Sequence, residues 1–249
     1  MPDFTLIDIS KEDDRLIGEA KIKYGKIYDN TENLVFFLWD FLKSAEADAW
    51  IFASFLSQVR KFAILSLLST IRKHNAQSLM DIRQIFEASV LATYSLHERN
   101  DTTYYYKDKN DVAYVKENVR AKAYKWLGDN YKNHSDTIKN QKQIINNMWT
   151  HANILLTPLN FRLEGEEKFL SSVFDNEDDF QAKNNLWFLA NSCWGLLDLF
   201  AREIIKTKMA KLSDDFVLKM QQFGKDNEFL KKELTADPRI NKWIIADKR

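Results

Sequence analysis

Apolar residues recur at intervals of three and four positions along most of this chain, which is the spacing of helices that pack one face on a core. The pattern predicts helices over about residues 11–24, 31–74, 78–99, 109–132, 135–157, 178–210 and 214–234. The 31–74 stretch is long enough for two helices, and we expect the joint between them near Lys43–Ala45.

Capping residues set the predicted ends of the first helices. Ser10 precedes the first helix and Gly25 follows it, which are the residue types preferred at a helix start and a helix end. Asp29 and Glu32 have the spacing of a capping box just before the long apolar stretch.

Two prolines and an apolar tail define the other predicted ends. The helix from residue 135 must stop near Thr157, because Pro158 disfavours helical geometry in the residue before it. Pro238 ends the last helix in the same way. The segment Trp243–Ile245 then predicts an apolar end that docks on the core.

One segment does not have a helical pattern. Phe161–Leu163 and Phe169–Val173 flank the polar residues Glu164–Glu167, which predicts a short β-hairpin within residues 161–173. The whole chain of 249 residues contains only 6 glycines and 3 prolines, too few for the many turns of a sandwich or barrel. The sequence therefore predicts an all-α multi-helix bundle, folded as a single domain over residues 1–249.

Charge and cysteine content indicate an intracellular protein without a general attraction for polyanions. The 36 basic residues balance the 36 acidic ones, so no global field draws the chain to nucleic acid or to an anionic membrane. Cys193 is the single cysteine and lies in an apolar stretch, which indicates a buried, inert thiol and a reducing, cytoplasmic setting. The N-terminus lacks the pattern of a signal peptide, and Gln143–Phe161, the longest uncharged run, is too polar to span a bilayer, so we expect no membrane segment.

A charged pair stands out on the helix predicted from residue 78, which Ser78 and Asp81 would cap. Arg83 and Glu87 are one turn apart on this helix. At about 100° per residue, both fall near its apolar side rather than on its polar arc, so we expect them to face packed surface. The apolar side comprises Leu79, Val90 and Tyr94. The polar arc, on the opposite side, comprises Asp81, Gln84 and Ser95.

Two interpretations of this pair follow, because an unpaired charge removed from water is very costly. Arg83 and Glu87 either form a structural ion pair that ties the helix to its neighbours or belong to a binding site. His151, at the edge of an apolar stripe, is either a boundary residue of the core or a general base near neutral pH. If the three meet across a helix pair, they form a polar pocket and are the candidate catalytic residues.

A basic segment offers a second candidate site. Residues 116–142 carry seven basic side chains against three acidic ones, with tyrosines nearby. Lys116, Arg120, Lys122 and Lys125 are the candidate contacts for RNA or an acidic partner, although such segments are also common as solvated helix faces. Residues 164–179 are acidic, and the alternative is that the two segments meet within one molecule or between subunits of a homodimer.

Most sequence patterns that carry chemistry are missing. The chain has no Gly-x-Gly for a phosphate loop, no Gly-x-Ser-x-Gly elbow, and no Glu-x-x-His pair. The four histidines are at least 17 residues apart. We therefore expect no metal site and no cofactor, and the sequence leaves open whether the chain is an enzyme.

The helix with Arg83-x-x-x-Glu87, followed by the helix end Trp149-Thr150-His151, resembles a group of uncharacterised all-helical bacterial proteins, some of which are linked to abortive-infection phage defence. The resemblance covers about residues 78–156 and rests on three positions. A neighbouring family, the HEPN helical proteins, includes metal-independent ribonucleases that carry Arg-x4–6-His. Here no arginine precedes any histidine at that spacing, and Asn146-x4-His151 lacks the cation that would stabilise a phosphate transition state.

The sequence thus leaves two functional hypotheses. The first is a cytoplasmic helical interaction protein, associated with defence and without chemistry of its own, which binds a protein partner or itself. The second is an HEPN-like ribonuclease or nucleotide-binding protein with a polar pocket around Arg83, Glu87 and His151.

Overall fold

The computed structural model describes residues 5–149, 157–164, 168–176 and 178–239. Helices dominate it, which confirms the predicted all-α class. They are α1 (Leu6–Tyr24), α2 (Lys26–Asp40), α3 (Trp50–Ile71), α4 (Asn75–His97), α5 (Val119–Asn130), α6 (Lys132–Trp149), α7 (Thr157–Asn160), α8 (Asp179–Thr207) and α9 (Phe216–Thr235). Short 3-10 turns occupy Ala47–Ala49 and Asp101–Thr103.

Three antiparallel strand pairs accompany the helices. They are β1 (Leu42–Ala45) with β6 (Ala210–Leu212), β2 (Tyr105–Lys107) with β3 (Ala113–Val115), and β4 (Phe161–Glu164) with β5 (Lys168–Ser171). The last pair confirms the hairpin predicted within residues 161–173. The first pair falls at the predicted joint between α2 and α3, where it fastens the α2–α3 connection to the α8–α9 connection.

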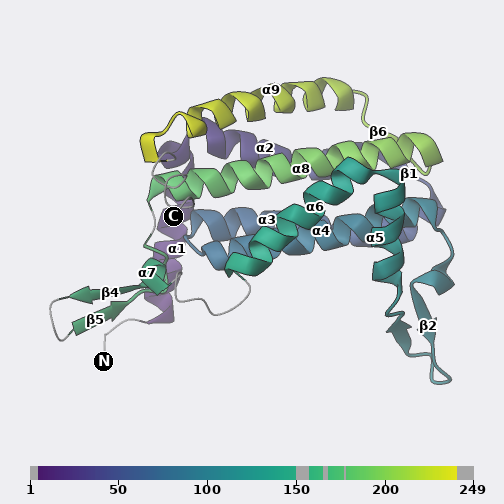
Figure 1. The fold of residues 1–249 in the computed structure, drawn as a ribbon, viewed down its shortest axis with the longest axis horizontal. Helices are drawn as coiled ribbons and strands as arrows, with labels where there is room; N and C mark the ends of the chain where they lie inside the picture. The colour runs from purple at the N-terminus through teal and green to yellow at the C-terminus, as the bar shows by residue number, and fades with distance from the viewer. Residues whose placement is uncertain (1–4, 150–156, 165–167, 177, 240–249) are drawn as a thin grey trace.

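The long helices lie side by side, and shorter elements close the two ends (Figure 1). α3 and α4 form an antiparallel hairpin, and α8 packs along both. α2 and α9 lie on the other side of α8, while α1 crosses one end of the bundle and α5 stands at the other (Figure 1). The β2–β3 and β4–β5 hairpins project from opposite ends (Figure 1).

Aromatic rings fill the centre of the core. Phe200 of α8 stacks on Phe41 at the end of α2, with 6.1 Å between ring centroids, and meets Phe52 of α3 edge to face at 5.9 Å. All three side chains are fully buried. Because one ring from each of three helices meets here, this contact fixes how α2, α3 and α8 sit relative to one another.

Small hydroxyl side chains let α3 and α4 approach closely. Ser78 of α4 contacts Thr70 of α3 at 2.6 Å and Ser66 of α3 at 3.1 Å through their hydroxyl oxygens. These buried groups therefore satisfy one another instead of needing water. Ser78 was expected to cap α4, but the helix begins at Asn75, whose backbone N–H donates to a carboxylate oxygen of Asp175 at 2.7 Å.

Tryptophans of α8 hold α9 in place. The indole N–H of Trp187 donates to the carbonyl of Asn227 at 2.9 Å, and that of Trp194 donates to the carbonyl of Met220 at 3.0 Å. The two donors are seven residues apart on α8 and the two acceptors are seven residues apart on α9, so the bonds link the helices at two separate levels. The side chain of Asn227 also accepts a hydrogen bond from Asn30 of α2 at 2.7 Å, which ties α9 to a third helix.

Several predicted helix starts were wrong because nearer capping groups exist. α1 begins after Thr5, whose side chain forms a capping box with Asp8, rather than at Ser10. Gly25 ends α1 as predicted, with φ of 57°, and α2 begins directly after it. Asp29 and Glu32 therefore lie inside α2 and not at its start.

The helix predicted from residue 109 begins ten residues later, because β2 and β3 form a hairpin first. A carboxylate oxygen of Asp108 accepts from the backbone N–H groups of Asn110 and Val112, and Asp111 has φ of 61°, so the turn is built by side-chain capping. Tyr106 and Tyr114 stack across the strands at 5.5 Å.

The predicted polar arc of α4 was also wrong. Asp81 and Ser95 are 2% and 3% exposed, because α4 is covered on nearly all sides by α3, α8, α5 and α6. Ser95 donates to the carbonyl of Ala92. Burial raises the pKa of Asp81, and hydrogen bonds with Gln77 and Ser69 offset part of that rise.

One described helix, Ala47–Ile71, is long and apolar enough to cross a membrane, with a mean hydropathy of 1.4 in its best window. This helix forms the most extensive helix pair of the molecule, with α4, and core helices share such a composition. The absence of a membrane segment stays a prediction.

We expect Trp187→Phe to weaken the attachment of α9. The ring remains, but the hydrogen bond to the Asn227 carbonyl is lost, which costs about 1 kcal/mol. Hydrogen exchange should accelerate in α9 and stay unchanged in α3 and α4. Trp50→Phe, at a position 46% exposed, is the control. Uniform acceleration across all helices would contradict this assignment.

We expect Asp81→Asn to stabilise the fold at pH 7. The folded-state pKa of Asp81 is raised, so its carboxylate costs stability above that pKa and costs little near the unfolded value of about 3.8. The gain should be roughly 1 kcal/mol at pH 7 and smaller at pH 4, measured by thermal unfolding. Asp129→Asn, on the exposed side of α5, should change neither; an equal gain at both pH values would refute this explanation.

Candidate anion-binding site

Glu87 of α4 holds three cations on one carboxylate oxygen. Its Oε1 lies 2.9 Å from Nη2 of Arg120 and 2.9 Å from Nζ of Lys142. Nε of Arg83 lies 3.5 Å from the same oxygen. Nζ of Lys142 also donates to the hydroxyl of Tyr124 at 2.7 Å. We refer to Arg83, Glu87, Arg120, Tyr124 and Lys142 as the Glu87 cluster.

Three helices bring these side chains together. α5 buries Ala123 and Leu127 against the bundle, which places Arg120 and Tyr124 beside α4. On α6, Lys142 lies on the stripe of Ile138 and Ile145, both of which are buried. The sequence signal for its role is a lysine on an apolar stripe, but Lys142 was not among the residues predicted to bind RNA or an acidic partner.

Exposure increases across the cluster. The side chains of Lys142 and Glu87 are 11% and 18% exposed, that of Arg83 is 26% exposed, and that of Arg120 is 53% exposed. Nε of Arg83 is buried and makes no hydrogen bond. The cluster is therefore closed at Lys142 and open to solvent at Arg120.

Burial shifts the pKa values of two groups. It lowers the pKa of Lys142, although Glu87 opposes that change by favouring the charged ammonium. Burial and the nearby Glu87 carboxylate raise the pKa of the Tyr124 hydroxyl to about 12, so this group stays protonated at neutral pH. Tyr124 can therefore donate its proton to a further acceptor.

The charges of the cluster do not balance. Arg83, Arg120 and Lys142 supply three cations and Glu87 supplies one carboxylate, which leaves an excess of two positive charges. A partly dehydrated excess of this kind attracts anions more strongly than the same charges in water. The arrangement thus favours an oxyanion such as phosphate, with arginine donors and a phenolic hydroxyl to bind it.

The structure links the two sites that the sequence suggested. Arg83 and Glu87 face α5 and α6, and Arg120 of the basic segment reaches Glu87. Lys122 and Lys125 are exposed on α5, and Lys116 is partly exposed before it. No ion pair of these three is found among the described residues.

The described ion pairs of the acidic segment, residues 164–179, are with residues outside the basic segment. Asp178 pairs with Arg239 and Asp179 pairs with Lys23. The basic and acidic segments are thus not seen to meet within the described part of the molecule.

His151 lies outside the described residues, as does the 243–245 tail, so their predicted contacts stay predictions. The other histidines have structural surroundings: His74 stacks on Phe174, His97 stacks on Trp126, and His134 pairs with Asp198 at 3.0 Å. No group of three metal-ligating side chains occurs in the described ranges. Cys193 is fully buried, which raises the pKa of its thiol to about 12, as its apolar surroundings indicated.

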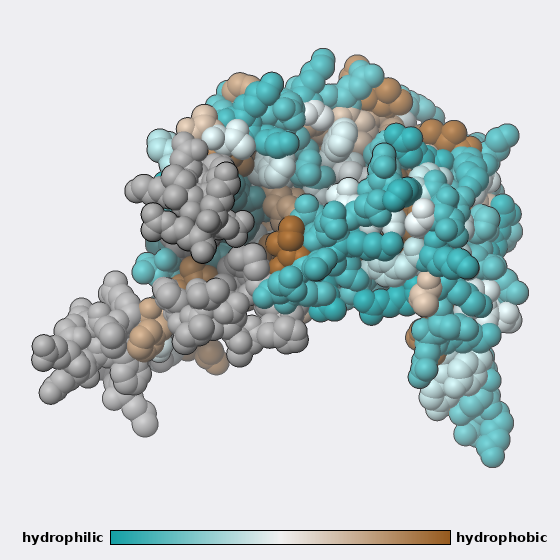
Figure 2. All heavy atoms as spheres, viewed as in Figure 1, coloured by the Kyte–Doolittle hydropathy of each residue, from teal (hydrophilic) through white to brown (hydrophobic). Residues whose placement is uncertain are grey.

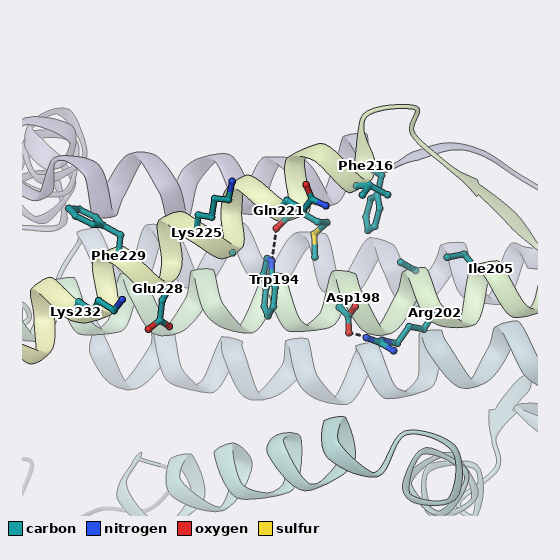
Figure 3. Close-up of a pocket in the computed structure, with 14 residues that line it drawn as sticks. Trp194, Asp198, Arg202, Ile205, Phe216, Gln221, Lys225, Glu228, Phe229 and Lys232 are labelled. Atoms are coloured by element: carbon teal, nitrogen blue, oxygen red, sulfur yellow. Dashed lines mark hydrogen bonds and ion pairs between the residues drawn. The ribbon is translucent and has the colours of Figure 1, made fainter.

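A second feature, which was not predicted from the sequence, is an open groove between α8 and α9. Its volume is about 870 Å³ and its lining is mostly apolar. Trp194 lies at its centre, Ile205 and Phe216 at one end, and Phe229 and Lys232 at the other (Figure 3). In the space-filling view, apolar side chains gather along the upper edge over α9, whereas the face over α5 and α6 is largely hydrophilic (Figure 2).

We expect Glu87→Gln to destabilise the protein, because it leaves three cations without a carboxylate. Loss of one partner from a buried ion pair costs about 3–5 kcal/mol, and the partial exposure here favours the lower end. The melting temperature should fall by roughly 6–12 °C, and added salt should reduce the loss. Glu117→Gln, at an exposed position, is the control. A variant as stable as the parent would show that Glu87 does not hold the cations.

Comparisons with protein-family models, with curated proteins and with solved structures find no match to this chain.

Proposed function

We propose that this chain is a helical binding protein, without chemistry of its own, that recognises a phosphate-bearing ligand at the Glu87 cluster. The single observation that carries the proposal is the convergence of three cations on one carboxylate oxygen. A purely structural ion pair would need one cation. The two further charges lower the stability of the free protein through mutual repulsion, and a bound anion would relieve that repulsion.

The donors are suited to phosphate. Arg120 contacts Glu87 through Nη2, and its guanidinium carries four further N–H groups at the open side of the cluster. Arginine binds phosphate through two parallel hydrogen bonds, which a lysine cannot reproduce. At about 4 Å and an effective dielectric of about 20, each cation attracts a phosphate charge by roughly 4 kcal/mol before desolvation is counted.

The surroundings favour a ligand that extends beyond one phosphate. Lys122 and Lys125 continue the positive charge along the exposed side of α5, and the face over α5 and α6 is hydrophilic (Figure 2). A nucleotide would occupy the Glu87 cluster alone, whereas RNA would also contact these lysines. Cleavage of RNA would need a general base, and His151 is the candidate for that role. Ribonuclease activity is therefore the alternative to binding alone.

The resemblance to defence-associated helical proteins fits a binding protein of this kind, and so does a bacterial cytoplasm as its setting. Both stay predictions, because they rest on the sequence alone.

Arg120→Gln tests the proposal, with Lys122→Gln as the matched control on the same helix. Binding of pyrophosphate, ATP and a ten-nucleotide single-stranded RNA should be measured by calorimetry and fluorescence anisotropy. We expect Arg120→Gln to weaken all binding by about 10- to 100-fold, the value of a charge-assisted hydrogen bond. Lys122→Gln should leave pyrophosphate binding unchanged, weaken RNA binding and lower the salt dependence of RNA binding.

Three outcomes would count against the proposal: no binding of any probe, equal effects of the two variants, or RNA cleavage that Arg120→Gln abolishes. The Glu87→Gln variant gives an independent check. It lacks the competing carboxylate, so pyrophosphate should raise its melting temperature more than that of the parent.

A further inference from the structure

The α8–α9 groove leaves apolar side chains of both helices uncovered. Ile205 is 67% exposed, Val217 is 64% exposed and Phe229 is 51% exposed. Grouped apolar exposure of this kind is common at docking surfaces. The groove lies between helices that do not contribute to the Glu87 cluster, so it is independent of the proposed anion site.

The residues that line the groove are spaced so that one more helix can pack against them. Trp194, Asp198, Ala201 and Ile205 line it from α8, at spacings of four, three and four residues. α9 presents a matching stripe with the same spacings. Each stripe spans eleven residues, which is about 16 Å along a helix. The α9 stripe comprises Val217, Gln221, Gly224 and Glu228.

Trp194 and Gly224 keep the floor of the groove shallow. The indole N–H of Trp194 is bonded to the Met220 carbonyl, so its ring lies between the two helices (Figure 3). A Cβ on Gly224 would lie 3.3 Å from that ring, so the glycine allows α9 to rest on it. A side chain laid over the groove therefore meets a flat apolar surface.

Charges border this surface in an alternating order. Lys225, Glu228 and Lys232 are exposed on α9, with no ion pair among the described residues. On the α8 side, Asp198 pairs with Arg202 at 2.7 Å and with His134 at 3.0 Å. The charges offered to an occupant are therefore positive, negative and positive, at spacings of three and four residues.

α1 of the same chain carries the opposite order. Arg15 and Glu19 are exposed and Glu12 is partly exposed, with the same spacings and opposite signs. Within α1, Arg15 pairs with Glu12 at 2.5 Å and with Glu19 at 2.7 Å, so these pairs would be shared with the second helix. Ile22, three residues beyond Glu19, is 90% exposed, and Ile7 is 66% exposed. The opposite side of α1 buries Leu16, Ala20 and Tyr24, so this outer face is unoccupied within the described molecule.

The two helices match in one orientation. At about 100° per residue, Val217 and Gly224 lie on the same rotational side of the α9 charges as Ile7 and Ile22 do of the α1 charges, whereas Phe229 lies on the other side of the α9 charges. Only antiparallel packing then brings both apolar sides together. It places Glu19 at Lys225, Arg15 at Glu228 and Glu12 at Lys232, and it brings Ile22 to the part of the groove that Gln221 lines.

We propose that the α8–α9 groove binds α1 of a second copy of this chain. In a two-fold dimer the contact occurs twice, because each copy offers both a groove and an α1 face. The interface combines an apolar centre over Trp194 with three ion pairs at its rim, which set orientation and specificity more than affinity.

Sedimentation velocity of the full chain over about 1–200 µM tests the proposal. We expect a concentration-dependent dimer. Ile22→Asp should raise its dissociation constant at least tenfold, because a carboxylate would be buried on the apolar floor. Leu218→Asp is the matched control, since Leu218 is 73% exposed on α9 but does not line the groove.

Charge reversal identifies the partner helix. Lys225→Glu combined with Lys232→Glu should weaken the dimer at least tenfold, and adding Glu12→Lys and Glu19→Lys to the same chain should restore it to within about threefold. Glu19, Lys225 and Lys232 are exposed and Glu12 is partly exposed, and thermal unfolding confirms that each variant is folded. A chain that stays monomeric, a dimer insensitive to Ile22→Asp, or a failure of the four-fold variant to recover would each overturn the proposal. Binding of a helix from an unrelated protein in place of dimerisation would do so as well.

Discussion

The near-complete enclosure of α4 is the constraint on which the rest of the structure depends. Helices on four sides leave its polar residues little water, so each must find a partner inside the protein. Ser78 finds hydroxyls of α3, and Glu87 finds cations of α5 and α6. The carboxylate therefore determines where α5 and α6 can sit, and the Glu87 cluster follows from how this one helix is packed.

The enclosure of α4 also indicates which charges of the Glu87 cluster the fold requires and which it does not. One cation would neutralise Glu87, and Lys142, the most buried of the three, supplies it. Arg83 and Arg120 add charge that the fold does not require, at the side that opens to solvent. Excess charge held near a low-dielectric surface costs stability, and this cost is the physical reason for proposing an anionic ligand.

Local sequence pattern was enough to predict the class, the α2–α3 joint and the β4–β5 hairpin. It failed where tertiary contacts override local signals. Asp81 looked like a cap or a solvated residue, yet it is buried because four helices surround α4. The N-terminus of α4 is capped by Asp175, a hundred residues away, and no local pattern contains that information. Arg83 and Glu87 could be singled out as misplaced charges, but their partners on α5 and α6 depended on packing that a wheel does not describe.

The net charge of zero is the sum of two different arrangements of charged residues. The Glu87 cluster concentrates positive charge at one place, whereas α1 and α9 carry alternating charges of opposite order. Concentrated charge attracts any anion over a distance and is weakened by salt, while alternating charge has little long-range field and acts only at contact. Under the two proposals, the first pattern would gather a charged ligand on one face and the second would select a partner on another. The balance of 36 basic and 36 acidic residues is therefore the sum of two unlike patterns, and each has to be judged from its neighbours in space.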